Sequence, residues 1–139
     1  MKTMKTLALL ENLDQVQDFV EQQLLEAGCP DKTRMQVAMA VEEIYVNIVD
    51  YAYFPGTGDV EVHCSLKEAP LQVIIEFRDG GQPFDPLEHP EADISLSADE
   101  REVGGLGIFM TRQLMDEVDY RYEHGKNILT LKKEWEEVD

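Results

Sequence analysis

A chain of 139 residues has room for one domain, because two separate cores of half this size would each bury too little surface to be stable. Hydrophobic residues make up 43% and charged residues 29%, the balance of an ordinary globular protein. The 29 acidic residues outnumber the 12 basic ones and give a net charge of -17. This charge argues against nucleic acid as a direct partner, because binding to phosphate backbones needs clustered cations.

Two interpretations of the acidity remain open: it keeps the protein soluble, or its field attracts a basic protein partner. The apolar run at residues 7–10 is too short for the core of a signal peptide, and no segment is long enough to span a bilayer. We therefore expect a cytoplasmic location and no membrane partner. Cys29 and Cys64 fit a reducing compartment, and each is expected to be a small buried hydrophobe.

The first elements follow from apolar spacing. Residues 5–10 are compatible with a short edge strand, and a helix begins after Asn12 or Asp14 and runs to about Ala27. Its apolar stripe consists of Leu13, Val16, Val20, Leu24 and Ala27. Gly28 is the residue expected to end it.

The second predicted helix, residues 31–53, carries an apolar stripe and a polar pair. The stripe consists of Val37, Val41, Ile44 and Ile48. Glu43 and Asn47 lie one turn apart on another face, among apolar neighbours, so they need partners if they are buried. Either they form a structural pair, or the amide oxygen binds Mg²⁺ beside a carboxylate that accepts a proton.

A hairpin follows, with apolar alternation over residues 60–66 and 71–77. Asp79-Gly80-Gly81 then ends the second strand. This run is either an ordinary turn or a site in which the aspartate accepts a hydrogen bond from an exocyclic amine such as that of adenine. In the second case the glycines allow a planar base to approach the backbone.

Residues 83–103 show no period and are predicted to be a loop, after which residues 104–107 open a third helix to about residue 117. Glycine-rich helix starts are common, but the free amides and dipole of such an end also favour phosphate. The run matches neither the Walker pattern nor the dinucleotide-binding pattern. Two strands, at about 118–123 and 126–133, complete the predicted elements, and residues 134–139 are expected to be a frayed acidic end.

The order of these features resembles the GHKL ATPases, and within them the anti-sigma-factor serine kinases. Residues 42–53 (EEIYVNIVDYAY) resemble the N-box of that family, and residues 79–86 (DGGQPFDP) resemble its first glycine box. Residues 104–108 (GGLGI) resemble the second glycine box, and residues 114–118 continue the match. The resemblance covers nearly the whole chain.

The resemblance implies a Bergerat-type ATP-binding fold, an α/β two-layer sandwich with a mixed, mostly antiparallel sheet and helices on one face. It implies a single kinase domain over residues 1–139 that binds ATP or ADP with Mg²⁺ under a lid loop at residues 83–103. Asn47 would hold Mg²⁺, Glu43 would be the general base, and Asp79 would read the adenine amine. The other implied nucleotide contacts are Gly81, Arg101, Gly104, Gly105, Leu106, Gly107 and Asn127.

The resemblance also implies a function. The family phosphorylates a serine of an anti-anti-sigma protein of the STAS type, binds a sigma factor, and commonly forms homodimers. The alternative is a nucleotide-gated binding module that changes partners without phosphoryl transfer. The sequence departs from the family at Tyr51, where histidine is frequent, and at Asn127, where many relatives place a threonine near the nucleotide.

Overall fold

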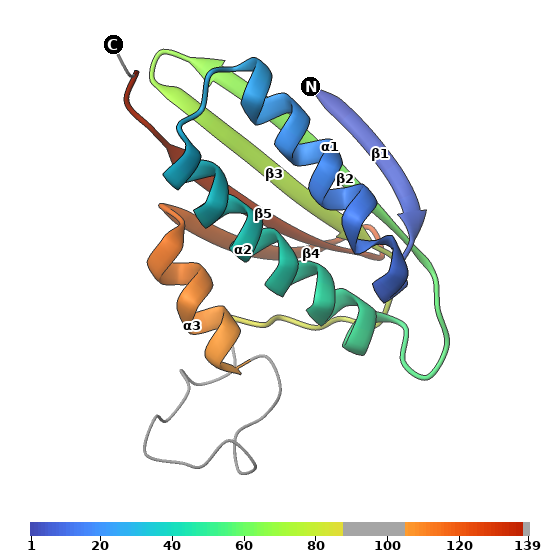
Figure 1. The fold of residues 1–139 in the computed structure, drawn as a ribbon. Helices are drawn as coiled ribbons and strands as arrows, with labels where there is room; N and C mark the ends of the chain where they lie inside the picture. Colours follow the sequence, from blue (N-terminus) through green and yellow to red (C-terminus); the bar gives the residue numbers. More distant parts are fainter. Residues whose placement is uncertain (88–104, 138–139) are drawn as a thin grey trace.

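The computed structural model describes residues 1–87 and 105–137. Within them, five strands form one sheet in the order β1-β2-β3-β5-β4, and all four pairings are antiparallel (Figure 1). The strands are β1 (Lys2–Leu7), β2 (Asp59–Glu68), β3 (Leu71–Asp79), β4 (Glu117–Glu123) and β5 (Lys126–Glu134). The mostly antiparallel sheet expected from the sequence is therefore confirmed.

Three α-helices cover one face of this sheet (Figure 1). They are α1 (Leu13–Glu26), α2 (Asp31–Asn47) and α3 (Gly105–Leu114). A 3-10 turn, η1 (Leu10–Asn12), precedes α1, and a π-helical turn, η2 (Ile48–Ala52), extends α2. The helices and the sheet form the two layers of the predicted α/β sandwich.

The core lies between the two layers. Val16, Val20 and Leu24 of α1 are at most 2% exposed, as their spacing on one helix face predicts. They share one hydrophobic cluster with the buried stripe of α2 and with the alternating inward residues of β2, β3 and β5. Burial of each large apolar side chain contributes about 1.5–3 kcal/mol, so this cluster fixes how the helices lie on the sheet.

The register of the sheet places a polar residue at the end of its central strand. Asp79, the last residue of β3, lies between Val60 of β2 and Asn127 of β5. It has the same parity along the strand as the buried Phe77, so its side chain faces the helical layer. Asp79 is 3% exposed and Asn127 is 5% exposed. A carboxylate and an amide are thus brought together under the helices.

The predicted boundary of the first strand was wrong, and the second helix changes its type near its end. The edge strand is Lys2–Leu7 rather than residues 5–10, because the amide of Ala8 already donates to the carbonyl of Gly58 outside the β1–β2 pairing. The second helix is α-helical only to Asn47 and continues as the wider turn η2 to Ala52. Apolar periodicity does not distinguish an α-helix from a single π-helical turn.

Two predictions near the end of the chain were also wrong. The third helix ends at Leu114 instead of residue 117, because the amide of Asp116 donates its hydrogen bond to the carbonyl of Lys132 in β5. The segment after residue 134 is not wholly frayed: Trp135 is 8% exposed, and its amide donates to the carbonyl of Leu71.

Both cysteines are free thiols inside the core. Burial raises the pKa of Cys29 to about 11, and it raises the pKa of Cys64 to about 11 as well. Thiols with such pKa values carry almost no thiolate at neutral pH, so the expectation of small buried hydrophobes is confirmed. Among the described helices, none combines the length and the hydrophobicity that crossing a membrane needs.

Tyr45 of α2 provides a test of how the N-terminal segment is attached. Its ring is fully buried, and its hydroxyl donates to the carbonyl oxygens of Leu9 at 2.6 Å and Leu7 at 3.2 Å. Tyr45→Phe removes the donor and leaves these carbonyls without it, so we expect the free energy of unfolding to fall by about 1–3 kcal/mol. Urea unfolding measures this change.

The control is Tyr122→Phe, since Tyr122 is 45% exposed. Its free energy of unfolding should stay within about 0.5 kcal/mol of the wild type. Equal stability of both variants would show that the Tyr45 hydroxyl does not hold the segment after β1.

Candidate functional site

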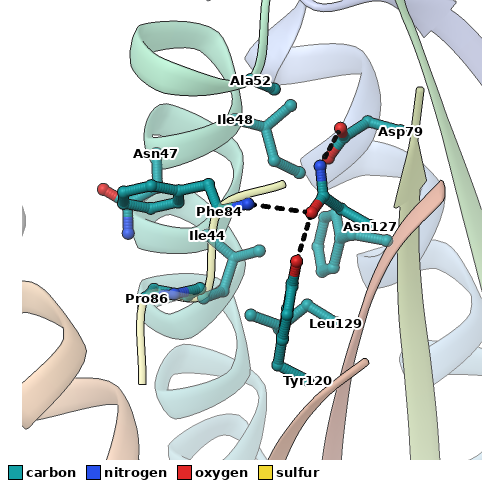
Figure 2. A pocket seen from close by; sticks show the side chains of 11 residues that line it. Ile44, Asn47, Ile48, Ala52, Asp79, Phe84, Pro86, Tyr120, Asn127 and Leu129 are labelled. Carbon is teal, nitrogen blue, oxygen red and sulfur yellow. Dashed lines mark hydrogen bonds between the residues drawn. The ribbon is translucent and has the colours of Figure 1, made fainter. Parts of the chain in front are cut away.

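A pocket lies between the end of α2 and the sheet, and both layers contribute to its walls (Figure 2). Its lining consists of Ile44, Asn47, Ile48, Ala52, Phe77, Asp79, Phe84, Pro86, Tyr120, Asn127 and Leu129. The walls are mostly apolar and carry a few polar groups, which is the usual composition of a small-molecule site. The cavity measures about 30 Å³, room for about two water molecules.

Asp79 is the charged residue of this pocket. Its Oδ1 accepts hydrogen bonds from the amide of Gly81 at 2.9 Å and from Nδ2 of Asn127 at 2.8 Å. Burial raises the pKa of the carboxyl above its usual value, while these two hydrogen bonds and the charge of Lys126 lower it part of the way. Asp79 is therefore a buried acceptor, and both hydrogen bonds that it accepts from the described residues end on the same oxygen.

The turn after Asp79 is fastened to the end of η2. The amide of Gln82 donates to the carbonyl of Ala52 at 2.8 Å, and the amide of Gly80 donates to the hydroxyl of Tyr53 at 2.8 Å. A Cβ on Gly81 would lie 2.1 Å from the carbonyl oxygen of Ala52, so only glycine fits there. The sequence-predicted N-box and first glycine box are thus in direct contact.

Glu43 and Asn47 point from α2 toward the same region. Asn47 is 6% exposed and lines the pocket. Oε1 of Glu43 is buried and has no hydrogen-bond partner among the described residues. Burial raises the pKa of Glu43 to about 7, while a hydrogen bond with the Asn47 side chain lowers it, and the charges of Glu42 and Asp50 raise it further. Such a carboxyl exchanges its proton near neutral pH.

The first turn of α3 packs directly on this carboxylate. A Cβ on Gly107 would lie 1.9 Å from Cδ of Glu43, so any side chain at residue 107 would displace the glutamate. Thr111, one turn further along α3, is 1% exposed and donates from its hydroxyl to the carbonyl of Gly107 at 2.8 Å. The glycine-rich helix start and the predicted general base therefore meet in the folded chain.

The structure brings together most of the residues predicted from the sequence. Asn47, Asp79 and Asn127 line one pocket, and Gly81 packs against Ala52 in its wall. Glu43 has a hydrogen bond with Asn47, and Gly107 packs against Glu43. Gly105 and Leu106 lie in the first turn of α3. Arg101, Gly104 and residues 88–103 of the expected lid lie outside the described residues.

Sequence reasoning missed three tyrosine contacts at this site. Tyr51, noted only as a departure from the family, stacks on Phe84 with ring centroids 4.9 Å apart and planes inclined by 17°. The hydroxyl of Tyr53 holds Gly80, and the hydroxyl of Tyr120 donates to Oδ1 of Asn127. Tyr51 and Tyr53 lie in the N-box at residues 42–53, so the sequence offered a signal for them, whereas nothing in the sequence indicated Tyr120.

Comparison with known proteins finds a matching family and several related proteins. The profile of a family described as "Histidine kinase-like ATPase domain" matches residues 6–133. The serine/threonine-protein kinase BtrW of Bordetella bronchiseptica is 28% identical over 100 residues, which cover 72% of this chain and 70% of that protein. The serine-protein kinase RsbW of Halalkalibacterium halodurans is 33% identical over 93 residues, covering 64% of this chain and 56% of that protein.

A further serine-protein kinase RsbW, from Bacillus thuringiensis, is 26% identical over 96 residues. The match covers 68% of this chain and 60% of that kinase, so the chain spans about three fifths of these RsbW relatives. Among solved structures, the histidine kinase domain of the blue-light activated histidine kinase of Erythrobacter litoralis EL346 is similar, with a TM-score of 0.56 and 14% identity. That likeness covers 87% of this chain and 60% of the other, and it supports the fold.

The raised pKa of Glu43 predicts a dependence of stability on pH in the protein without nucleotide or Mg²⁺. The pKa is about 7 in the folded chain and 4.5 in the reference state, so between these values the folded chain binds more protons than the unfolded one. The contribution of Glu43 to the free energy of unfolding is therefore present below about pH 4.5 and is lost as the pH rises toward 7. We expect Glu43→Gln to be more stable than the wild type at pH 8, by about 1–3 kcal/mol.

Urea unfolding of both proteins at pH 4.5 and pH 8 measures this difference. The advantage of the glutamine variant should be much smaller at pH 4.5, where the wild-type carboxyl is protonated. An equal advantage at both pH values would show that Glu43 titrates normally in the folded chain.

Proposed function

Because the chain belongs to the family of histidine kinase-like ATPase domains, we propose that it is an ATP-dependent anti-sigma-factor serine/threonine protein kinase. It phosphorylates an anti-anti-sigma protein and binds a sigma factor. The observation that carries this proposal is the contact of Glu43 with Gly107, which places a carboxyl of pKa about 7 at the glycine-rich start of α3. The serine kinases BtrW and RsbW among its relatives support the same activity.

The pocket suits the adenine of ATP. Its apolar walls, formed among others by Ile44, Ile48 and Leu129, match the faces of a planar base. Asp79 offers a carboxylate oxygen to the exocyclic amine, and Gly81 lies in the turn beside it. A hydrogen bond to a charged acceptor is worth about 1.5–3 kcal/mol, enough to set the orientation of the base.

The residues near α3 suit the phosphates and Mg²⁺. Asn47 has an amide oxygen of the kind that Mg²⁺ binds, and the start of α3 at Gly105 presents backbone amides to phosphate. The buried and unpartnered Oε1 of Glu43 fits a site completed by a polar group from outside the protein. Bound Mg²⁺-ATP supplies a γ-phosphoryl group whose charge the metal neutralises.

Glu43 then acts as the general base. Its carboxylate accepts the proton of the serine hydroxyl of the bound protein substrate as the serine oxygen forms its bond to phosphorus and ADP leaves. A pKa of about 7 leaves part of the residue ionised at neutral pH, and the ionised form is the one that can accept a proton. Arg101 of the lid and Gly104 of the second glycine box are proposed to complete the phosphate contacts.

The proposed partners follow from the family and the charge. They are a sigma factor and an anti-anti-sigma protein of the STAS type in the cytoplasm, and the kinase is proposed to form a homodimer. The net charge of -17 favours a partner that presents a basic face, because opposite fields speed encounter. No direct contact with nucleic acid is part of the proposal.

Nucleotide binding is tested with Asp79→Asn. The variant keeps the size of the side chain but replaces one acceptor with a donor that would face the adenine amine. We expect the dissociation constant of Mg²⁺-ATP, measured by calorimetry, to rise about 10- to 100-fold. Asp18→Asn, at an exposed residue of α1 that does not line the pocket, is the control and should bind as the wild type does. Unchanged ATP affinity in Asp79→Asn would remove this residue from the site.

The roles on α2 are separated by comparing two variants. Asn47→Ala should weaken Mg²⁺-dependent nucleotide binding about tenfold, because it removes one oxygen ligand. Glu43→Gln should bind nucleotide nearly as well as the wild type and lose about 10²- to 10⁴-fold in phosphoryl transfer to the anti-anti-sigma protein. The assay is transfer of radiolabelled phosphate to that protein.

Glu42→Gln is the matched control, because this neighbouring glutamate is exposed and its variant should retain transfer. If the wild type binds ATP and exchanges partners but transfers no phosphate, the protein is a nucleotide-gated binding module instead. If Glu43→Gln transfers phosphate at the wild-type rate, Glu43 is not the base.

A further inference from the structure

The side-chain amide of Asn127 uses all of its hydrogen-bonding positions. Its Oδ1 accepts from the amide of Phe84 at 3.1 Å and from the hydroxyl of Tyr120. Its Nδ2 donates to Oδ1 of Asp79 at 2.8 Å (Figure 2) and to the carbonyl of Gln82 at 2.8 Å. Two donors that meet at one end of an amide require oxygen there, so Phe84 and Tyr120 fix the direction in which the NH₂ group points.

This arrangement determines which oxygen of Asp79 remains available. Both hydrogen bonds that Asp79 accepts from the described residues, from Gly81 and from Asn127, end on Oδ1. Oδ2 is then the oxygen left for a ligand in the pocket that Asp79 lines. If the Asn127 amide were reversed, its own oxygen would face the carboxylate, and the carboxylate would lose the partner that holds its plane.

The same amide also holds one wall of the pocket. Phe84 lines the cavity, stacks on Tyr51 and donates its backbone amide to Asn127. The wall at Phe84 is therefore tied to the same amide that orients Asp79.

We propose that Asn127, oriented by Tyr120, is the positioning residue that sets base selectivity in this pocket. It holds Oδ1 of Asp79 so that Oδ2 meets the 6-amino group of adenine, and it does not contact the base itself. The inference rests on the proposed binding of ATP. It assigns to Asn127 and Tyr120 a role in choosing between a 6-amino purine and a 6-oxo purine.

The test compares ATP with ITP, which carries a 6-oxo group in place of the amine. Calorimetry with Mg²⁺ gives the ratio of the two dissociation constants for the wild type, Tyr120→Phe and Asn127→Leu. The wild type should prefer ATP by about tenfold or more, since ITP sets a carbonyl oxygen against the carboxylate. We expect the preference to fall about threefold or more in Tyr120→Phe, and to approach equality in Asn127→Leu.

Tyr122→Phe is the matched control, because Tyr122 lies on the same strand, is 45% exposed and does not line the pocket. It should keep the wild-type ratio. Melting temperatures are recorded for every variant, and Tyr120→Phe loses one hydroxyl and should fold even if Asn127→Leu does not. A merely structural role for Asn127 and Tyr120 would weaken both nucleotides equally and leave the ratio unchanged.

The outcomes separate the two proposals. If the wild type prefers ATP and Tyr120→Phe keeps the full preference, the positioning role is overturned while nucleotide binding stands. If the wild type binds ATP and ITP equally, Asp79 does not read the amine, and the positioning role falls with it. If the wild type binds neither nucleotide, the proposed function itself is overturned.

Discussion

The carboxylate of Asp79 is buried at the end of the central strand β3, and burial of such a group requires partners from several parts of the chain. One partner is the amide of Gly81, which is available only because the chain turns sharply after β3. The turn presses so closely on Ala52 that no side chain fits at residue 81. The other partner is Asn127, which the register of β5 places opposite Asp79. The requirements of one carboxylate therefore account for the turn, its contact with η2 and the identity of a residue on β5.

Glu43 presents the opposite case. It is a second carboxyl near the pocket, but Oε1 has no partner among the described residues, and its pKa is raised to about 7. Asp79 accepts two hydrogen bonds from protein donors, whereas Glu43 has a hydrogen bond with the Asn47 side chain and packs against Gly107. Two carboxyl groups whose environments differ in this way commonly have different chemical roles. A carboxylate that is held by protein donors suits recognition of a ligand. A carboxyl with one unpartnered oxygen and a pKa of about 7 suits transfer of a proton.

Both features depend on the way in which the helical layer lies on the sheet. The buried stripe of α2 fixes the rotation of that helix, and this rotation directs Asn47 to the pocket and Glu43 toward α3. Helix α3 approaches so closely at Gly107 that its first turn and the carboxyl of Glu43 share one space. Apolar packing, which carries no chemical specificity, thus sets the geometry of the polar groups. Exposed acidic residues elsewhere on the surface are free of this constraint.

The sequence by itself determined the fold class and most of the site. Helical periodicity placed Glu43 and Asn47 one turn apart, strand alternation placed Asp79 at a buried strand end, and the order of the three motifs identified the family. It left open whether these groups were structural or functional, because spacing along one element does not reveal what faces it from another. Only the tertiary structure decided that Gly107 meets Glu43, that Asn127 holds Asp79, and that Tyr120 and Phe84 orient Asn127. These contacts join residues 7 to 64 positions apart in the chain, and strand register and helix packing, rather than local propensity, bring such residues together.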